Sequence, residues 1–170
     1  MIQVAEKPLF RILNTDEVPR MHTLESENFP SDEADSYNML AYRQRQAPNL
    51  QLGCYINGIM IGFIGATRYN GETYNKEAMK THIPNGGSVC IHSVVVQKEH
   101  RRKGIGLKLL QAFVKQVKEE QNNVTKILLI SKPEHIPLYE RAGFVLKGKS
   151  DIDLGKDTWY EFEIPLQSKY

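Results

Sequence analysis

The chain has 170 residues, 41% of them hydrophobic and 25% charged, which is enough for one globular domain with a substantial core and excludes a disordered chain. Its net charge of +2 is too small to indicate a nucleic-acid partner. No apolar run approaches the roughly 18 residues of a membrane span. The two cysteines, Cys54 and Cys90, exclude a disulfide framework or a four-cysteine metal site and favour a reducing compartment. From the length we expect a single domain over residues 1–170. Residues 1–10 lack the apolar core of a signal peptide, so we expect the protein in the cytoplasm, with no membrane partner.

The first half of the chain predicts helices and a hairpin. Residues 10–13 form a short strand, and Thr15 or Asp16 caps a helix that runs towards Phe29. Residues 30–33 end that helix and cap a second one. The strands 52–56 and 59–67 flank Asn57-Gly58, a pair typical of tight hairpin turns. A polar loop at 68–87 is long for a compact domain, and such loops are often functional.

The second half alternates strands with helices. Residues 88–97 give the strongest strand, and residues 104–121 give the strongest helix, with apolar residues at helical spacing. A strand at 126–131, a short helix at 137–142 and strands at 144–147 and 159–164 follow. This interleaving predicts an α/β fold with a single mixed central sheet of about seven strands, flanked by about four helices.

A basic, glycine-punctuated turn joins that strand to that helix. Free N–H groups at a helix start, together with the helix dipole, favour an anion, and glycines let a phosphate approach them. The turn lacks the Gly-Lys-Ser/Thr of a Walker A loop and the third glycine of a dinucleotide fingerprint, because Leu107-Lys108-Leu109 follow Gly106. A solvated turn with a basic rim is the alternative. The expected cofactor-binding residues are Val94, Val95, Val96, Arg101, Arg102, Lys103, Gly104, Ile105, Gly106 and Leu107.

A second pattern, Pro-Leu-Tyr-Glu-Arg-Ala-Gly-Phe at 137–144, follows at the distance that a strand and a helix require. Together the two patterns resemble the GCN5-related N-acetyltransferase (GNAT) superfamily. Residues 50–53, 91–96 and 155–159 are most similar to arylalkylamine N-acetyltransferases and their fungal relatives that accept polyamines. The resemblance implies the GNAT fold, with acetyl-coenzyme A as co-substrate and its pyrophosphate on the glycine turn. It also implies that the pantetheine arm pairs with the backbone of residues 94–96, and that Phe29, Cys90, Ile130 and Trp159 line the acceptor pocket.

Acetyl transfer to an amine needs a base and an acid. His92, with an ordinary pKa of about 6.5, is the candidate base, acting through water, although a satisfied core histidine is the alternative. Strand alternation places His92 on the face of Cys90, Val94 and Val96. Tyr139, protonated below a pKa of about 10, is the candidate acid near the coenzyme sulfur, unless it only packs under the sheet. Cys90 stands where the animal relatives carry a second histidine, as a buried thiol or an acetyl carrier.

We therefore expect an acetyl-CoA-dependent N-acetyltransferase that acts without a metal on a small arylalkylamine or polyamine, by direct attack in a ternary complex. The alternatives are an acetyltransferase of protein N-termini or lysines, and an acyl-CoA-binding module without turnover. Asp32, Glu33 and Asp35 either attract a polyamine or cap a helix. The expected partners are the amine and acetyl-CoA alone, in a monomer or dimer.

Overall fold

A computed structural model describes residues 7–166 and contains one seven-stranded sheet, which confirms the predicted fold class. The strand order is β1-β2-β3-β4-β5-β7-β6. Neighbouring strands are antiparallel except β4 and β5, which run parallel and are joined through helix α4. The strands are β1 Leu9–Ile12, β2 Gln51–Ile56, β3 Ile59–Tyr69, β4 Ser88–Val96, β5 Lys126–Ser131, β6 Val145–Lys149 and β7 Tyr160–Pro165.

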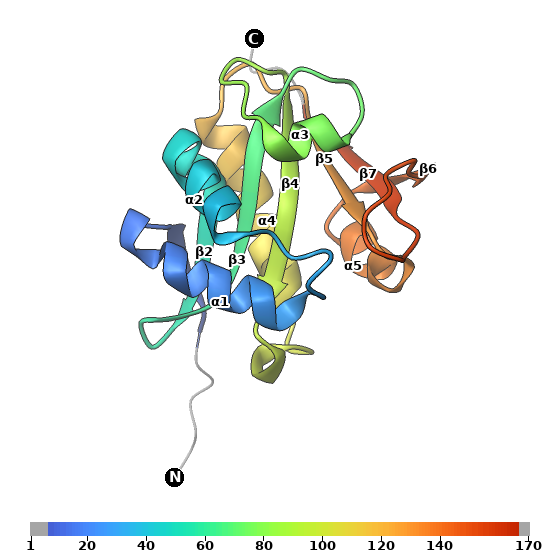
Figure 1. Ribbon diagram of the computed structural model, residues 1–170. Helices are drawn as coiled ribbons and strands as arrows, with labels where there is room; N and C mark the ends of the chain where they lie inside the picture. The colour runs from blue at the N-terminus through green and yellow to red at the C-terminus, as the bar shows by residue number, and fades with distance from the viewer. Residues whose placement is uncertain (1–6, 167–170) are drawn as a thin grey trace.

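Helices cover both faces of this sheet (Figure 1). Two of them, α1 and α2, lie over one face, and α4 lies over the other. The helices are α1 Val18–Asn28, α2 Tyr37–Gln46, α3 Lys76–Lys80, α4 Ile105–Glu120 and α5 Ile136–Arg141. The described residues thus form five α-helices where the sequence predicts about four, because α3 lies inside the segment expected to be an open loop.

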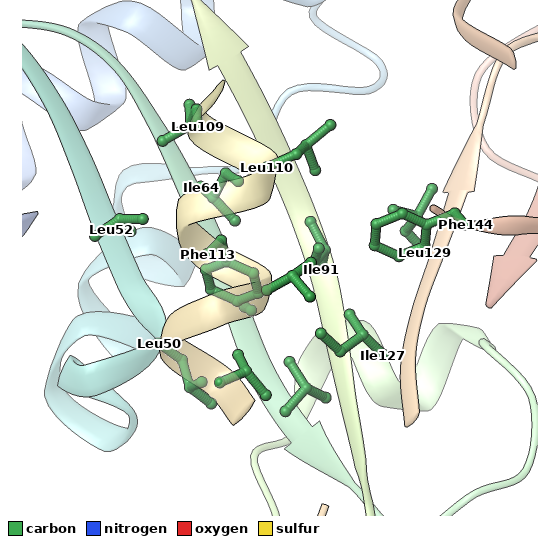
Figure 2. Packing of buried hydrophobic residues seen from close by; sticks show 14 of the residues in the cluster. Leu50, Leu52, Ile64, Ile91, Leu109, Leu110, Phe113, Ile127, Leu129 and Phe144 are labelled. Atoms are coloured by element: carbon green, nitrogen blue, oxygen red, sulfur yellow. The ribbon is translucent and has the colours of Figure 1, made fainter. Parts of the chain in front are cut away.

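The larger core cluster lies between the sheet and α4. Leu109, Leu110 and Phe113 of α4 pack against Ile64 and Ile91 of the central strands (Figure 2). Helical spacing brings these three side chains to one face. Burying each side chain stabilises the fold by roughly 1.5–3 kcal/mol before entropy is counted.

A second cluster lies on the opposite face, where α1 and α2 meet the sheet. Met21 and Leu24 of α1 pack with Leu40 of α2 against Phe63 and Val95. Apolar packing of α1 therefore holds this helix over β4. Because Glu25 follows these apolar residues on the same face of α1, its carboxylate is buried together with the core.

Two predicted helix starts are corrected. The first turn begins at Asn14, whose N–H donates to the Glu17 carboxylate at 3.0 Å, and not at Thr15 or Asp16. The cap of α2 is Ser36, whose Oγ accepts the N–H of Met39 at 3.1 Å, and not residues 30–33. Glu33 therefore does not cap α2.

A bulge in β4 corrects the predicted alternation. Ser93 pairs with Gly65 and Ile91 pairs with Ala66, so His92 is an extra residue without a partner in the ladder. An extra residue shifts the phase of the side chains that follow it. His92 therefore shares its side of the sheet with Cys90 but not with Val94 and Val96, which pack against the cluster that contains α4.

Candidate active site

A cleft opens where β4 and β5 separate. The two strands pair only through Ser88, Val89 and Cys90, yet both continue beyond that point. The diverging ends line a cavity of about 850 Å³. Since edges of separated strands carry unpaired backbone groups, this cleft suits an extended ligand with amide groups.

One side of the cleft is formed by residues 101–107 and α5, called here the glycine-loop side. Gly104 caps α4 with φ +76°, a conformation that favours glycine, and a Cβ built there would meet nothing within 4 Å. A Cβ on Gly106 would touch Leu138 at 3.8 Å and Val96 at 3.9 Å, which is ordinary contact. The first N–H groups of α4 have no intrahelical acceptor, so the open space before them suits an anion.

The three basic residues of this loop differ in position. Arg101 donates from Nε to the Val96 carbonyl at 3.1 Å and from Nη2 to Asn28, so it ties the loop to β4 and α1. Arg102, at φ +62°, is exposed and lines the cleft. Lys103 is exposed and is not part of the cleft wall.

Most residues predicted for ligand binding line the cleft, but three do not. Val95 is 1% exposed and its side chain packs on the opposite face, against α1 and α2. Lys103 points into solvent, as noted above. Cys90 is fully buried in the cluster beside α3, where burial raises the pKa of its thiol to about 12, so a nucleophilic thiolate is disfavoured. The predicted residues in the cleft wall are Phe29, His92, Val94, Val96, Arg101, Arg102, Gly104, Ile105, Gly106, Leu107, Ile130, Tyr139 and Trp159.

His92 lies in the middle of a short hydrogen-bonded chain. Its Nδ1 is 2.7 Å from the Tyr74 hydroxyl, and its Nε2 is 2.7 Å from the Thr67 hydroxyl. Thr67 donates its own proton to the Ala78 carbonyl, so it accepts from Nε2–H. The remaining nitrogen, Nδ1, therefore accepts from Tyr74.

This arrangement keeps the imidazole neutral. Burial, and secondarily the charge of Arg43, holds the pKa of His92 well below its ordinary value. Tyr74 also lines the cleft, and its N–H donates to Glu161 at 2.7 Å, which anchors this loop segment to β7. The Tyr74 hydroxyl thus connects the cleft with Nδ1 of His92.

Tyr139 lies on α5, on the glycine-loop side. Its ring packs against Phe144 and Phe162, with centroids 6.1 Å and 5.4 Å away. Burial raises its pKa above the ordinary value, so the phenol stays protonated. Tyr139 also lines the cleft, so its protonated side chain faces the cavity.

The other side of the cleft, called here the α1 side, consists of Glu25, Phe29, Glu33, Asp35 and Tyr74. Asp35 forms a two-point ion pair with Arg43, at 2.7 Å and 3.3 Å, and Arg43 is 1% exposed. The Asp35 N–H donates to Glu25 Oε2 at 3.0 Å. Burial, and then the neighbouring charge of Asp35, raises the pKa of Glu25 to about 7.

A cluster of ion pairs around Lys132 lies at the edge of the α1 side. Lys132, at the end of β5, lies 2.7 Å from Glu33 and 2.9 Å from Asp157. Its ammonium group also lies 5.5 Å from the centre of the Trp159 ring. Glu33 therefore neither caps α2 nor stands free, whereas Asp32 is exposed and outside the cleft wall.

Glu25, Tyr74 and Thr67 are site residues that the sequence interpretation missed. Glu25 had a readable signal, because it falls on the apolar repeat of α1 with Val18 and Met21, where a carboxylate is out of place. Tyr74 and Thr67 carry no such signal in the sequence, because only tertiary contacts bring them to His92.

The fold and cleft agree with the comparison to known families. The sequence profile described as Acetyltransferase (GNAT) family matches residues 18–144. This match spans α1 to α5 and includes every cleft residue except Leu154 and Trp159, so the chain belongs to the GNAT acetyltransferase family.

Three individual proteins that this chain resembles share less than 30% of its residues at aligned positions. A serotonin N-acetyltransferase of Mesocricetus auratus is 27% identical over 120 residues, which cover 71% of this chain and 58% of that protein. The chain thus spans under two thirds of the curated relative it matches. The loading GNATL domain of CurA from Lyngbya majuscula superposes with a TM-score of 0.82 at 13% identity, covering 94% and 98% of the two chains. Diaminobutyrate acetyltransferase EctA from Paenibacillus lautus, in complex with its substrate L-2,4-diaminobutyric acid and coenzyme A, superposes with a TM-score of 0.69 at 18% identity, covering 95% and 96% of the two chains.

Across residues 7–166, no three His, Cys, Asp or Glu side chains gather as a metal site. In the same range no helix has the length and apolar character needed to cross a membrane.

Proposed function

We propose that this protein transfers the acetyl group of acetyl-CoA to the primary amine of a small arylalkylamine or polyamine, by direct attack in a ternary complex. The observation that carries the proposal is the cleft between β4 and β5, which brings an anion-binding helix start, a protonated tyrosine and a neutral histidine to one cavity. Membership of the GNAT family supports it, as do the coenzyme A and the L-2,4-diaminobutyric acid that the structural neighbour EctA binds.

The residues of the cleft fit acetyl-CoA as the acyl donor. The glycine loop offers its N–H groups to the pyrophosphate, and the diverging edge of β4 offers backbone groups to the pantetheine amides. The thioester then lies beside Val94 and Tyr139.

The chain supplies both proton steps. An alkylamine with a pKa of about 10.4 is almost fully protonated at neutral pH, so it must lose a proton before attack. Tyr74 passes that proton to Nδ1 of His92, or exchanges it through water. The amine nitrogen bonds to the acetyl carbon, the C–S bond breaks, and Tyr139 gives its proton to the departing thiolate. The new amide nitrogen loses its extra proton through water to the Tyr139 phenolate, and His92 releases the first proton to solvent.

A thiol-release assay tests this function. Acetyl-CoA is offered with tryptamine, phenethylamine, spermine and a set of peptides, and free CoA is measured. We expect release with at least one small amine. Release with peptides alone indicates a protein acetyltransferase, and CoA binding without release for any acceptor indicates a non-catalytic acyl-CoA-binding module.

A further inference from the structure

Glu25 combines three features that burial alone does not explain. Its side chain lines the cleft although the residue is only 2% exposed. Oε2 accepts the N–H of Asp35 at 3.0 Å, whereas Oε1 is buried and has no hydrogen-bond partner among residues 7–166. Buried carboxylate oxygens are normally paired, so an open one in a ligand cavity points to a missing donor.

Burial and the charge of Asp35 oppose the negative charge of Glu25, whereas the Asp35 N–H, the Ser93 hydroxyl and, more weakly, Arg43 favour it. Glu25 stands in the last turn of α1, at the negative end of the helix dipole, and faces Asp35. Arg43, the cation on α2, directs Nη1 and Nη2 to Asp35 and the Met79 carbonyl, while its buried Nε has no hydrogen-bond partner among residues 7–166. Lys132 is committed to Glu33 and Asp157. The described chain thus leaves an anion without a dedicated cation.

The position of this anion is also informative. Its neighbour from β4 is Ser93, whose hydroxyl donates to Asp35 at 3.4 Å. Ser93 lies between His92 and Val94, next to the chain that takes the proton and to the proposed place of the thioester. A cation bound here would be held beside the reacting atoms.

We infer that the Glu25 carboxylate binds the ammonium group of the acceptor, so that the α1 side selects acceptors with a cationic amine over neutral analogues of the same shape. This inference rests on the proposed acetyl transfer. Glu25 accepts the ammonium N–H on Oε1 while Oε2 keeps its bond to Asp35, and Phe29 supplies an apolar wall for the rest of the acceptor.

A matched ligand pair tests the inference without turnover. The protein is saturated with CoA, and tryptamine or tryptophol, in which a hydroxyl replaces the ammonium group, is titrated by calorimetry at pH 8. We expect tryptamine to bind at least about tenfold more tightly than tryptophol, since a paired charge strengthens a buried hydrogen bond. Equal binding of the pair, or no binding of tryptamine, phenethylamine or spermine, overturns the inference.

Glu25→Gln keeps the size of the side chain and an oxygen for the Asp35 N–H. It should remove the preference for tryptamine and leave the affinity for CoA unchanged. Glu27→Gln, on the exposed face of the same helix, is the control and should keep the preference. A Glu25→Gln protein that still prefers tryptamine contradicts the inference.

The wild-type protein gives a second measurement if that variant folds poorly. The groups that face Glu25 are Asp35 from the 30–36 turn, Arg43 from α2 and Ser93 from β4, with His92 next along the strand. The pKa of Glu25 is near 7, whereas that of His92 lies well below 6.5. Tryptamine affinity should therefore rise severalfold from pH 6.5 to 8 as Glu25 ionises, and a flat profile contradicts the inference.

The outcome also separates this inference from the proposed function. If no acceptor releases thiol but tryptamine binds with a preference that depends on Glu25, the inference stands and acetyl transfer fails. If tryptamine is acetylated while Glu25→Gln binds it normally, the function stands and the inference fails.

Discussion

The two sides of the cleft are built in opposite ways. The loop of the glycine-loop side is one continuous stretch, residues 101–107, presented by the join between β4 and α4. The α1 side is assembled from α1, the 30–36 turn, the segment around Tyr74 and the end of β5, which lie far apart in the chain. A site made from consecutive backbone groups can be identified in a sequence, whereas one made from side chains on separate elements depends on packing.

The charges of the two sides differ as well. Arg101 and Arg102 stand at the glycine-loop side, where a phosphate is expected. The α1 side carries Glu25, Glu33 and Asp35, with Arg43 and Lys132 as partners. Variants on each side should therefore affect different ligands, and the following predictions test that division from the largest expected effect to the smallest.

The largest effect is expected for Tyr139→Phe. Loss of the acid that protonates the thiolate should lower kcat by about 100-fold, while calorimetry shows an unchanged Kd for CoA, because the ring still packs against Phe144 and Phe162. A variant with wild-type kcat would show that the hydroxyl takes no part in the reaction.

Glu25→Gln should change the pH dependence of stability. The folded pKa of about 7 exceeds the ordinary 4.5, so protonated Glu25 contributes stability below pH 4.5 that is lost as pH rises through 7. Relative to wild type, the variant should gain up to about 3 kcal/mol of unfolding free energy between pH 4.5 and 8, measured by urea unfolding. Glu27→Gln should show no such gain, and parallel curves for all three proteins would mean that Glu25 titrates normally.

Gly106→Ala tests the glycine-loop side without straining the backbone. The new Cβ has ordinary contacts with Leu138 and Val96, and it adds bulk to the cleft wall in the first turn of α4. Calorimetry should show at least about tenfold weaker CoA binding with an unchanged Tm.

Gly58→Ala is the matched control for that variant. Gly58 has φ +77° in the β2–β3 turn, outside the cleft wall, so alanine should lower Tm and leave CoA binding intact. Unchanged CoA affinity in Gly106→Ala would place the anion elsewhere.

The smallest effect is expected for Cys90→Ala. The thiol is buried outside the cleft wall, so kcat should stay within about twofold of wild type, with roughly 1 kcal/mol of lost stability from the small cavity. A large loss of kcat, or a trapped acetyl group on Cys90 in mass spectrometry, would restore it as an acetyl carrier.

The contrast between the two sides also explains what the sequence could predict. Apolar periodicity and turn residues located the strands, α4 and the single mixed sheet, because each signal is local. The bulge at His92 could not be seen in one strand, since it is defined by the partner β3, and it reversed the face predicted for Val94 and Val96. Helix α3 and the contacts of Tyr74 could not be predicted, because this polar segment is held by residues distant in the chain, such as Glu161 of β7 and Arg43 of α2.

Bisubstrate kinetics test the central claim most directly. Initial rates of thiol release are measured while acetyl-CoA and tryptamine are varied together, for wild type, Gly106→Ala and Glu25→Gln. The account predicts intersecting lines, as for a ternary complex, with Gly106→Ala raising KM for acetyl-CoA alone and Glu25→Gln raising KM for tryptamine alone. Parallel lines, or a variant that raises both constants equally, would contradict direct transfer in a cleft with two separate binding sides.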